Sequence, residues 1–339
     1  VSGRVIYAKN ATQKRAIAST TKIMTAIVAL EEGNLDDEVK ISKRAASIGG
    51  SVVGLREGQT YTLRELLYGM MLASGNDAAI AVAEHIGGSV EAFAKMMNAK
   101  ARAIGATDSN FVTPHGLDAD NQYSTAYDLA IITRYAIRNP VFMKIVSTTS
   151  YYIPEHGLYN TNELLATCPG VDGVKTGYTS KAGRCLVTSA FRNGMRLISV
   201  VLGSPTRTAR ANATRALLDY AYRNYRMANL VKAGDVYKKV PVYRGIMDSM
   251  ELITAQTLTV PLTDQEEELL EVREHIPDIL KAPVYAGSDV GVVEFVVNGE
   301  VIAQSNLKTS CDVRRKRYSD YLIDVFRHWA KMFREGIFA

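Results

Sequence analysis

The chain has 339 residues, 47% of them hydrophobic, and a formal net charge of +5, a composition that excludes fibrous and intrinsically disordered proteins. This length is more than one ordinary hydrophobic core accommodates, and it predicts two domains. Residues 313–339 hold seven Lys or Arg against three Asp or Glu, a net +4 that leaves +1 for the rest, so no basic stripe for a nucleic acid crosses the body.

The first 228 residues alternate helix-like and strand-like segments. Residues 4–7 resemble a strand, and because residue 1 is Val rather than Met we interpret the chain as a processed product whose signal peptide has been removed. Residues 19–31 predict a helix with Ser19 as its N-cap, and residues 61–87 contain further helices. Residues 185–203 predict two strands joined at Asn193-Gly194, followed by a helix over residues 207–227. We expect helices packed on an antiparallel sheet.

From residue 229 to residue 312 the pattern changes to short β-rich runs separated by Gly, Pro and Asn turns, with an acidic patch near Glu266. The runs cover residues 236–243, 251–260, 283–287, 291–297 and 300–307. They predict a small all-β domain. Residues 313–339 predict an amphipathic helix, because apolar side chains recur there at steps of three and four. No apolar run reaches about 18 residues, so we expect no helix that spans a bilayer.

The three cysteines are Cys168, Cys185 and Cys311. An odd and sparse set does not form a disulfide framework, and the pattern favours three thiols. One bridge between Cys168 and Cys185 stays open as an alternative. We see neither a cluster of metal ligands nor a nucleotide-binding loop, and we therefore expect no metal and no cofactor.

The first candidate for chemistry is the run Ser19-Thr20-Thr21-Lys22. A step of three residues on a helix brings the serine and the lysine onto one face, where a neutral lysine could take the hydroxyl proton. Burial and a second cation nearby would favour the neutral lysine. The same pattern recurs at Ser305 to Lys308, and a capping serine with a solvated lysine explains either copy equally well. The motif alone therefore does not identify a site.

Two further motifs each occur once. Ser74-Gly75-Asn76 offers a hydroxyl and an amide, although a loop between two helices would have the same residues. Lys175-Thr176-Gly177 offers a cation, a hydroxyl and a glycine that leaves room for a ligand at the backbone of an edge strand, although it could also be a plain turn. The three motifs begin 55 and 101 residues apart, and together they are the trio of penicillin-binding proteins and β-lactamases.

On these motifs, the chain resembles the low-molecular-mass penicillin-binding proteins that act as D-alanyl-D-alanine carboxypeptidases. The segments FVTPHGLDADNQYSTAYDLA and DGVKTGYTSKAG, the β-rich region and the amphipathic tail extend the resemblance over nearly the whole chain. It implies an α+β fold with a penicillin-binding/β-lactamase-like catalytic domain of helices and antiparallel sheet in residues 1–228. A small all-β domain in residues 229–312 and a membrane-associating amphipathic helix in residues 313–339 would follow.

The resemblance also implies the activity, which is hydrolysis of the terminal D-alanine from peptidoglycan stem peptides during cell-wall maturation. Ser19 would form an acyl-enzyme with Lys22 as its general base. Ser74, Asn76 and Lys175 would complete the network for proton transfer and binding. β-Lactams would inhibit the enzyme covalently, and the tail would hold it at the outer face of the bacterial cell membrane as a peripheral protein, with no nucleic-acid partner.

For the substrate itself, the resemblance implies an oxyanion hole made by the N–H groups of Ser19 and Tyr178. The free carboxylate of the last D-alanine would meet Thr176 and Arg210, and a guanidinium suits a carboxylate on physical grounds. Gly177 would leave room for the bound peptide. A helix-surface role for Arg210 is the competing interpretation.

The chain departs from its family in two places. Tyr178 stands where some relatives have histidine, a change that leaves the backbone N–H in place. Relatives also carry a strand upstream of the segment that matches VSGRVIYAKN, and a protein without that strand would be affected in stability more than in chemistry. His115, in the run TPHGLD, is expected to have a structural role.

Two other functions compete with the carboxypeptidase. A class A β-lactamase needs a glutamate that directs water onto the acyl-enzyme, and no Glu-x-x-x-Asn lies between Asn76 and Lys175. A peptidoglycan-binding or β-lactam-binding module with an inactive site would not need the intact Ser19 and Lys22.

Overall fold

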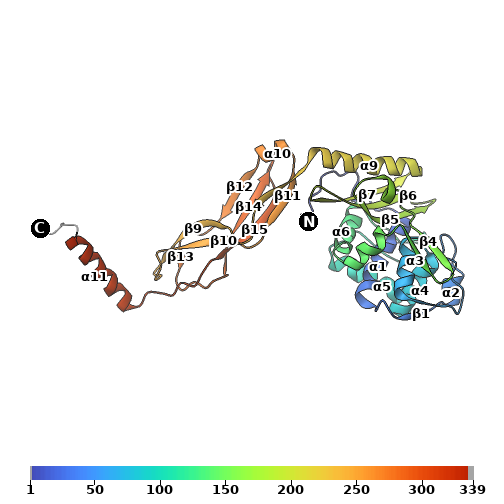
Figure 1. The fold of residues 1–339 in the computed structure, drawn as a ribbon, viewed down its shortest axis with the longest axis horizontal. Helices are drawn as coiled ribbons and strands as arrows, with labels where there is room; N and C mark the ends of the chain where they lie inside the picture. The colour runs from blue at the N-terminus through green and yellow to red at the C-terminus, as the bar shows by residue number, and fades with distance from the viewer. Residues whose placement is uncertain (1, 335–339) are drawn as a thin grey trace. The chain divides into compact units, whose positions relative to one another are not determined.

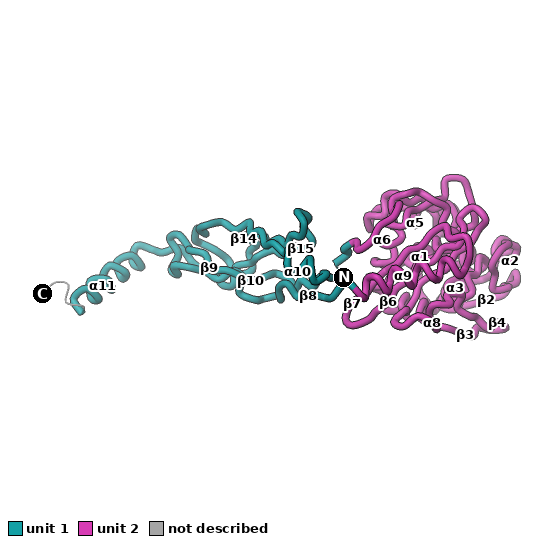
Figure 2. The backbone as a smooth tube through the Cα atoms, turned by 90° about the horizontal axis from the view of Figure 1, so that it is seen from above, with its two compact units in different colours: residues 1–4, 224–339 teal, residues 5–223 magenta. Residues whose placement is uncertain are grey.

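The computed structural model describes residues 2–334, and its contacts divide the chain into two compact units. One unit is formed by residues 5–223, and the other by residues 2–4 together with residues 224–334 (Figures 1 and 2). The predicted domain limits at residues 228 and 312 stay predictions, and the last five residues of the predicted tail helix lie outside the described part of the chain.

The unit of residues 5–223 is rich in helices. They are η1 (Ala18–Thr21), α1 (Lys22–Glu32), α2 (Lys43–Ala46), α3 (Leu63–Met71), α4 (Asn76–Gly87), α5 (Val90–Ala103), α6 (Ala126–Ala136), α7 (Pro140–Ser147), α8 (Leu164–Thr167) and α9, which begins here (Arg207–Asn224). Residues 22–29 of α1 and residues 76–83 of α4 are all buried. A helix that is buried on every side lies in the core, so the first residues of α1 and α4 are held firmly.

A three-stranded antiparallel sheet crosses this unit in the order β5 (Val171–Thr179), β6 (Gly183–Arg192), β7 (Met195–Ser204). The predicted pair joined at Asn193-Gly194 is confirmed, and both turn residues have positive φ, 48° and 77°, as a two-residue hairpin turn requires. Figure 1 shows α9 on one side of the sheet and α1 and α6 on the other. Strand β5, which carries the Lys-Thr-Gly motif, lies at an edge of this sheet as predicted.

Two small antiparallel pairs complete this unit: β1 (Glu38–Lys40) pairs with β2 (Thr60–Thr62), and β3 (Ser150–Ile153) forms a hairpin with β4 (His156–Tyr159). Helix α3 starts at a capping box, in which Thr62 and Glu65 each bind the backbone of the other.

Cys168, Cys185 and Cys311 are free, so the alternative of a Cys168–Cys185 bridge is wrong.

The second unit is mainly β-structure, as its sequence predicts. A six-stranded sheet has the order β12 (Glu271–His275), β14 (Asp289–Val297), β15 (Glu300–Thr309), β10 (Ser249–Thr254), β9 (Val236–Tyr243), β13 (Leu280–Lys281). Strands β8 (Arg226–Val231) and β11 (Leu258–Leu262) form a pair, and the helices are α10 (Asp264–Glu268) and α11 (Tyr318–Arg334). Its core includes Leu252, Val293 and Leu307, and the residues on either side of each along the strand are less buried.

Several local predictions were wrong. Residues 4–7 form no strand, because a strand needs a neighbouring chain to take its backbone hydrogen bonds and the structure pairs this stretch with none of the described strands. The predicted helix of residues 207–227 ends at Asn224, since residues from Arg226 onward pair with β11. The run 283–287 is not a strand, and only Val284 forms an isolated bridge, to Val313.

The prediction for the start of α1 was also wrong. Ser19 lies inside the 3₁₀ turn η1, and Thr21 occupies the position before α1 without a side-chain cap. The helix needs no such cap there, because the turn η1 continues directly into it. Ser19 is therefore free of a capping role.

Candidate active site

Lys22 lies at the centre of the site, fully buried at the first position of α1. Its Nζ lies 2.9 Å from Oγ of Ser19, 2.8 Å from Oδ1 of Asn76 and 2.8 Å from the backbone oxygen of His115. The two carbonyl oxygens can only accept, so they hold two N–H groups of the amine. The remaining tetrahedral position of Nζ faces the Ser19 hydroxyl. In the neutral amine this position holds the lone pair, which is available for the hydroxyl proton.

The electrostatics of the site favour that neutral amine. Burial lowers the pKa of Lys22 well below its ordinary value of 10.5, and the positive charge of Lys175 lowers it further, while Asp77 opposes the change. Burial also lowers the pKa of Lys175 to about 7, with a further contribution from Arg210. Each cation thus makes its neighbour easier to deprotonate.

Close backbone packing fixes the turn that carries Ser19. Ala18, directly before it, has a left-handed φ of 49°, which is costly for a residue with a side chain. A Cβ added to Gly116 would lie 2.0 Å from the Ala18 carbonyl oxygen, and one added to Gly177 would lie 3.0 Å from the Ser19 nitrogen. Glycine is needed at Gly116, whose own φ is 86°, so that the loop can approach the turn.

The Ser74-Gly75-Asn76 motif forms the link between α3 and α4. Ser74 is buried with a φ of 62°, and Asn76 is the first residue of α4. The amide of Asn76 donates to the Gly49 oxygen at 2.8 Å, which turns its Oδ1 toward Lys22. The structure thereby brings Asn76 to Ser19 and Lys22. Within residues 2–334, no hydrogen bond joins the Ser74 hydroxyl to either of them.

Sequence reasoning missed Asp77, the residue after the motif. Its carboxylate accepts hydrogen bonds from the backbone N–H groups of Val53, Gly54 and Leu55 at 2.8 to 3.1 Å. These bonds fix the loop beside the start of α4. The sequence signal for Asp77 was its position directly after the motif, at the N-terminus of a helix. Carboxylates at such positions bind free backbone N–H groups.

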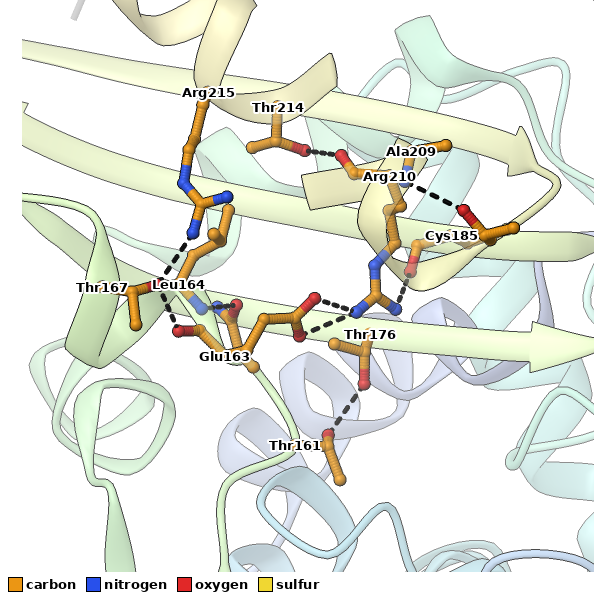
Figure 3. Close-up of polar contacts among 12 residues, drawn as sticks. Thr161, Glu163, Leu164, Thr167, Thr176, Cys185, Ala209, Arg210, Thr214 and Arg215 are labelled. Atoms are coloured by element: carbon orange, nitrogen blue, oxygen red, sulfur yellow. Dashed lines mark hydrogen bonds and ion pairs between the residues drawn. The ribbon is translucent and has the colours of Figure 1, made fainter. Parts of the chain in front are cut away.

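The Lys-Thr-Gly motif lies on β5 as predicted. Nζ of Lys175 donates to the backbone oxygen of Thr176 at 3.2 Å, and both side chains are buried. The Thr176 hydroxyl lies 2.7 Å from the Thr161 hydroxyl (Figure 3). Tyr178 is 51% exposed, and the guanidinium of Arg184 lies 3.6 Å from the centre of its ring. The tyrosine ring thus lies at the surface, against Arg184.

Arg210 reaches the same region from the first turns of α9. Its side chain is 4% exposed, so the competing interpretation of a helix-surface residue is wrong. Its Nη2 donates to both carboxylate oxygens of Glu163, at 2.6 and 2.7 Å, and its Nη1 donates to the Cys185 oxygen at 3.4 Å (Figure 3). Sequence reasoning missed Glu163, which no motif marks.

Two other predicted features have structural explanations. His115 contributes its backbone oxygen to Lys22, and its ring accepts a hydrogen bond from Leu117 N at 3.1 Å. Burial lowers the pKa of His115 to about 3, so the ring stays neutral. Ser305 and Lys308 lie on strand β15, where residues three apart point to opposite faces, so this copy of the motif cannot join its side chains.

No group of three His, Cys, Asp or Glu side chains that could hold a metal ion occurs within residues 2–334. The groups that the structure gathers are a hydroxyl, two amines, an amide and a guanidinium. This set suits nucleophilic acyl transfer.

Comparison with known proteins identifies the family. Residues 1–206 match the peptidase S11 family, described as D-alanyl-D-alanine carboxypeptidase, and residues 225–315 match the penicillin-binding protein 5 C-terminal domain. The D-alanyl-D-alanine carboxypeptidase DacF of Bacillus subtilis (strain 168) is 37% identical over 342 residues, 97% of this chain and 88% of the relative. DacA of Haemophilus influenzae is 36% identical over 326 residues, 92% of this chain and 82% of the relative.

Among solved structures, penicillin binding protein 5 from Haemophilus influenzae superposes with a TM-score of 0.83 at 34% identity, covering 92% of this chain and 94% of the other. The expected α+β catalytic domain followed by an all-β domain is confirmed. The expected activity, that of a serine-type D-alanyl-D-alanine carboxypeptidase in cell-wall maturation, is confirmed as well. The chain belongs to the peptidase S11 family of D-alanyl-D-alanine carboxypeptidases.

Proposed function

We propose that this D-alanyl-D-alanine carboxypeptidase uses Ser19 as its nucleophile and Lys22 as its general base. The observation that carries the proposal is the placement of Nζ of Lys22, which lies 2.9 Å from Oγ of Ser19 while two carbonyl oxygens hold its N–H groups. A base within this distance and with a lowered pKa is what activation of a serine requires.

In the proposed reaction, Oγ of Ser19 attacks the carbonyl carbon between the last two D-alanines and its proton passes to Lys22. The tetrahedral intermediate then collapses, the C–N bond breaks, and the nitrogen of the leaving D-alanine takes a proton. Water next attacks the ester carbonyl carbon, and Ser19 leaves with a proton. Ser74, Asn76 and Lys175 are proposed to relay protons and to hold the substrate.

The binding residues follow from the same reaction. The N–H groups of Ser19 and Tyr178 are proposed to stabilise the oxyanion, which is usually a large contribution in acyl transfer. Gly177 supports this assignment, because its missing side chain lets β5 approach the Ser19 nitrogen. Thr176 and Arg210 are proposed to bind the free carboxylate of the last D-alanine, since both carry donors in one region of the site.

Penicillin tests the nucleophile and the function together. After exposure to penicillin, mass spectrometry of the proteolysed protein is expected to find a stable adduct on the peptide that contains Ser19. The variant Ser19→Ala should carry none and should release no D-alanine from a peptide that ends in D-Ala-D-Ala. Release of D-alanine by this variant would contradict the proposal. Rapid loss of the adduct would favour a β-lactamase, and peptide binding without any adduct would favour a binding module.

We also propose that α11 binds the outer face of the bacterial cell membrane as a peripheral helix. No helix within residues 2–334 is long and apolar enough to cross a bilayer. Large apolar side chains of α11 are nevertheless exposed, with Tyr318 at 80%, Phe326 at 68% and Trp329 at 60%. Together with the four cations of Arg314–Arg317, this is the composition of a helix that lies in the membrane interface.

Sedimentation with vesicles tests the membrane role. The protein is expected to sediment with vesicles that contain anionic lipid, and the double variant Phe326→Ser, Trp329→Ser should stay in the supernatant. The matched control is Tyr152→Ser, which removes a 73% exposed aromatic ring from strand β3 and should leave sedimentation unchanged. Equal sedimentation of both variants would refute the role of α11.

A further inference from the structure

The region proposed to bind the substrate carboxylate already contains a carboxylate of the protein. Glu163 precedes α8, and both of its side-chain oxygens accept from Nη2 of Arg210 (Figure 3). Two residues earlier in the chain, Thr161 pairs with the Thr176 hydroxyl. One short segment thus contacts both groups that the incoming carboxylate would need.

The backbone of this segment is fixed. Thr161 N donates to the Leu72 oxygen at 3.1 Å, and the Asn162 amide donates to the Gly173 oxygen on β5 at 3.1 Å. Oδ1 of Asn162 accepts in turn from Leu164 N at 3.2 Å. Any change in the contact to Arg210 must therefore come from rotation of the Glu163 side chain.

That side chain is able to rotate away. Its exposure is 37%, against 4% for Arg210, and it does not cap helix α8. A glutamate has three rotatable side-chain bonds, so it reaches solvent without moving its backbone. The buried guanidinium has no comparable path, and of the two partners only Glu163 can give way.

The contact also leaves part of the guanidinium unused. Glu163 binds one nitrogen with both oxygens, whereas the strongest pairing of the two groups uses two nitrogens in parallel. Nη1 makes a long bond of 3.4 Å to Cys185, and Nε is buried without a hydrogen-bond partner within residues 2–334. A second carboxylate could thus bind Arg210 more completely, and repulsion between the two carboxylates would then expel Glu163.

We propose that Glu163 is an internal competitor for the substrate carboxylate: it holds Arg210 in the free enzyme and gives way when a peptide with a free C-terminus binds. The proposal rests on the proposed role of Arg210 in binding that carboxylate. Glu163 is on this view a specificity-determining residue. It weakens the binding of every free carboxylate, including the D-alanine product, and so favours product release.

The test compares two peptides that end in D-Ala-D-Ala, one with a free carboxylate and one with a terminal carboxamide. In Glu163→Gln, KM for the acid peptide should fall about two- to fivefold, the size expected for a partly exposed ion pair, with kcat nearly unchanged. Inhibition by added D-alanine should strengthen by the same factor. KM for the amide peptide should not change.

A matched control is Glu91→Gln, which also removes a carboxylate from an arginine pair, at the exposed start of α5. It should leave both peptides unaffected. A rise in KM for the acid peptide in Glu163→Gln would overturn the proposal, because it would mean that Glu163 merely positions Arg210. An unchanged KM, or an equal change for both peptides, would overturn it as well.

Arg210→Gln separates this proposal from the one on which it rests. It should raise KM for the acid peptide at least about thirtyfold and spare the amide peptide, and Glu163→Gln added to it should have no further effect. If Arg210→Gln affects both peptides equally, the carboxylate role of Arg210 fails. If Arg210→Gln behaves as expected and Glu163→Gln does not, only the competitor proposal fails.

Discussion

Two neighbouring regions of the proposed active site give their buried cations different partners. Around Ser19, the amines of Lys22 and Lys175 bind hydroxyl, amide and backbone oxygens, and burial lowers the pKa of both. At the start of α9, Arg210 is buried equally but receives the carboxylate of Glu163. A lysine without a counter-ion can become a base, whereas an arginine always keeps its charge. The first region therefore suits the proposed proton transfer, and the second suits the proposed binding of an anion.

The largest expected effect removes the base from the first region. Lys22→Met should slow acylation of Ser19 by penicillin by about 10³- to 10⁴-fold, because the serine loses the group that takes its proton. The rate of adduct formation, followed by mass spectrometry, measures this effect. Lys181→Met, at an exposed position after β5, is the control and should acylate normally. A similar rate in both variants would show that Lys22 is no base.

Removal of the Lys175 amine should stabilise the fold and abolish turnover. The pKa of Lys175 is about 7 in the folded protein and 10.5 unfolded, so between these values the unfolded chain binds the extra proton. Stability of the wild type should therefore rise with pH from about 7 to 10.5, and the full cost of burying the charge applies below about pH 7.

Lys175→Met should accordingly raise the free energy of unfolding by about 1–3 kcal/mol at pH 7, where burial of an unpaired amine is costly. The gain should shrink as the pH approaches 10.5. Urea denaturation at pH 7 and pH 10 measures both values. A variant that is less stable than the wild type at pH 7 would contradict the contrast drawn between the two regions.

A smaller effect links the two regions through charge. If the ammonium of Lys175 is required, kcat/KM should fall above pH 7, and this alkaline limb reports the pKa of Lys175. Burial is the main cause of the low pKa of Lys175 and Arg210 adds to it, so Arg210→Gln should move the limb to higher pH. The amide peptide is the suitable substrate, since it does not depend on the carboxylate contact. If the alkaline limb stays at the same pH in Arg210→Gln, the charge of Arg210 does not affect the pKa of Lys175.

The smallest effect concerns Tyr178, which is proposed to act through its backbone N–H. Tyr178→His should change the acylation rate by less than about threefold, since the exposed ring and its contact with Arg184 lie outside the proposed chemistry. A stopped-flow measurement with a chromogenic β-lactam detects such a difference. A loss of more than tenfold would assign the ring a direct role.

Sequence reasoning named the side chains of the first region, and of the second region it named Arg210 but missed Glu163. Ser19, Lys22, Asn76 and Lys175 belong to motifs with fixed spacing, and the structure brings Ser19, Lys22 and Asn76 into contact. No pattern marks Glu163, because its role depends on where α8 and α9 meet in three dimensions. The His115 oxygen was equally hidden, since a backbone atom leaves no trace in residue type.

The fold shows the same limit. The hairpin at Asn193-Gly194 was predictable because its turn residues tolerate positive φ, as observed. Strand β12 was not, since all five of its residues are exposed and show no alternation of apolar and polar side chains. Strand β8 escaped prediction because its start had been assigned to the preceding helix. Tertiary pairing, not local preference, decides both strands.

The acceptors that hold Lys22 come from residues 54 and 93 positions further along the chain. A nascent or unfolded chain therefore has an ordinary protonated lysine and an inert serine, and it acquires its reactivity only when these distant segments assemble. Covalent labelling by a fluorescent penicillin would for this reason count folded molecules only. The same label could follow refolding or thermal inactivation of this enzyme in a cell envelope, where no optical signal of folding is accessible.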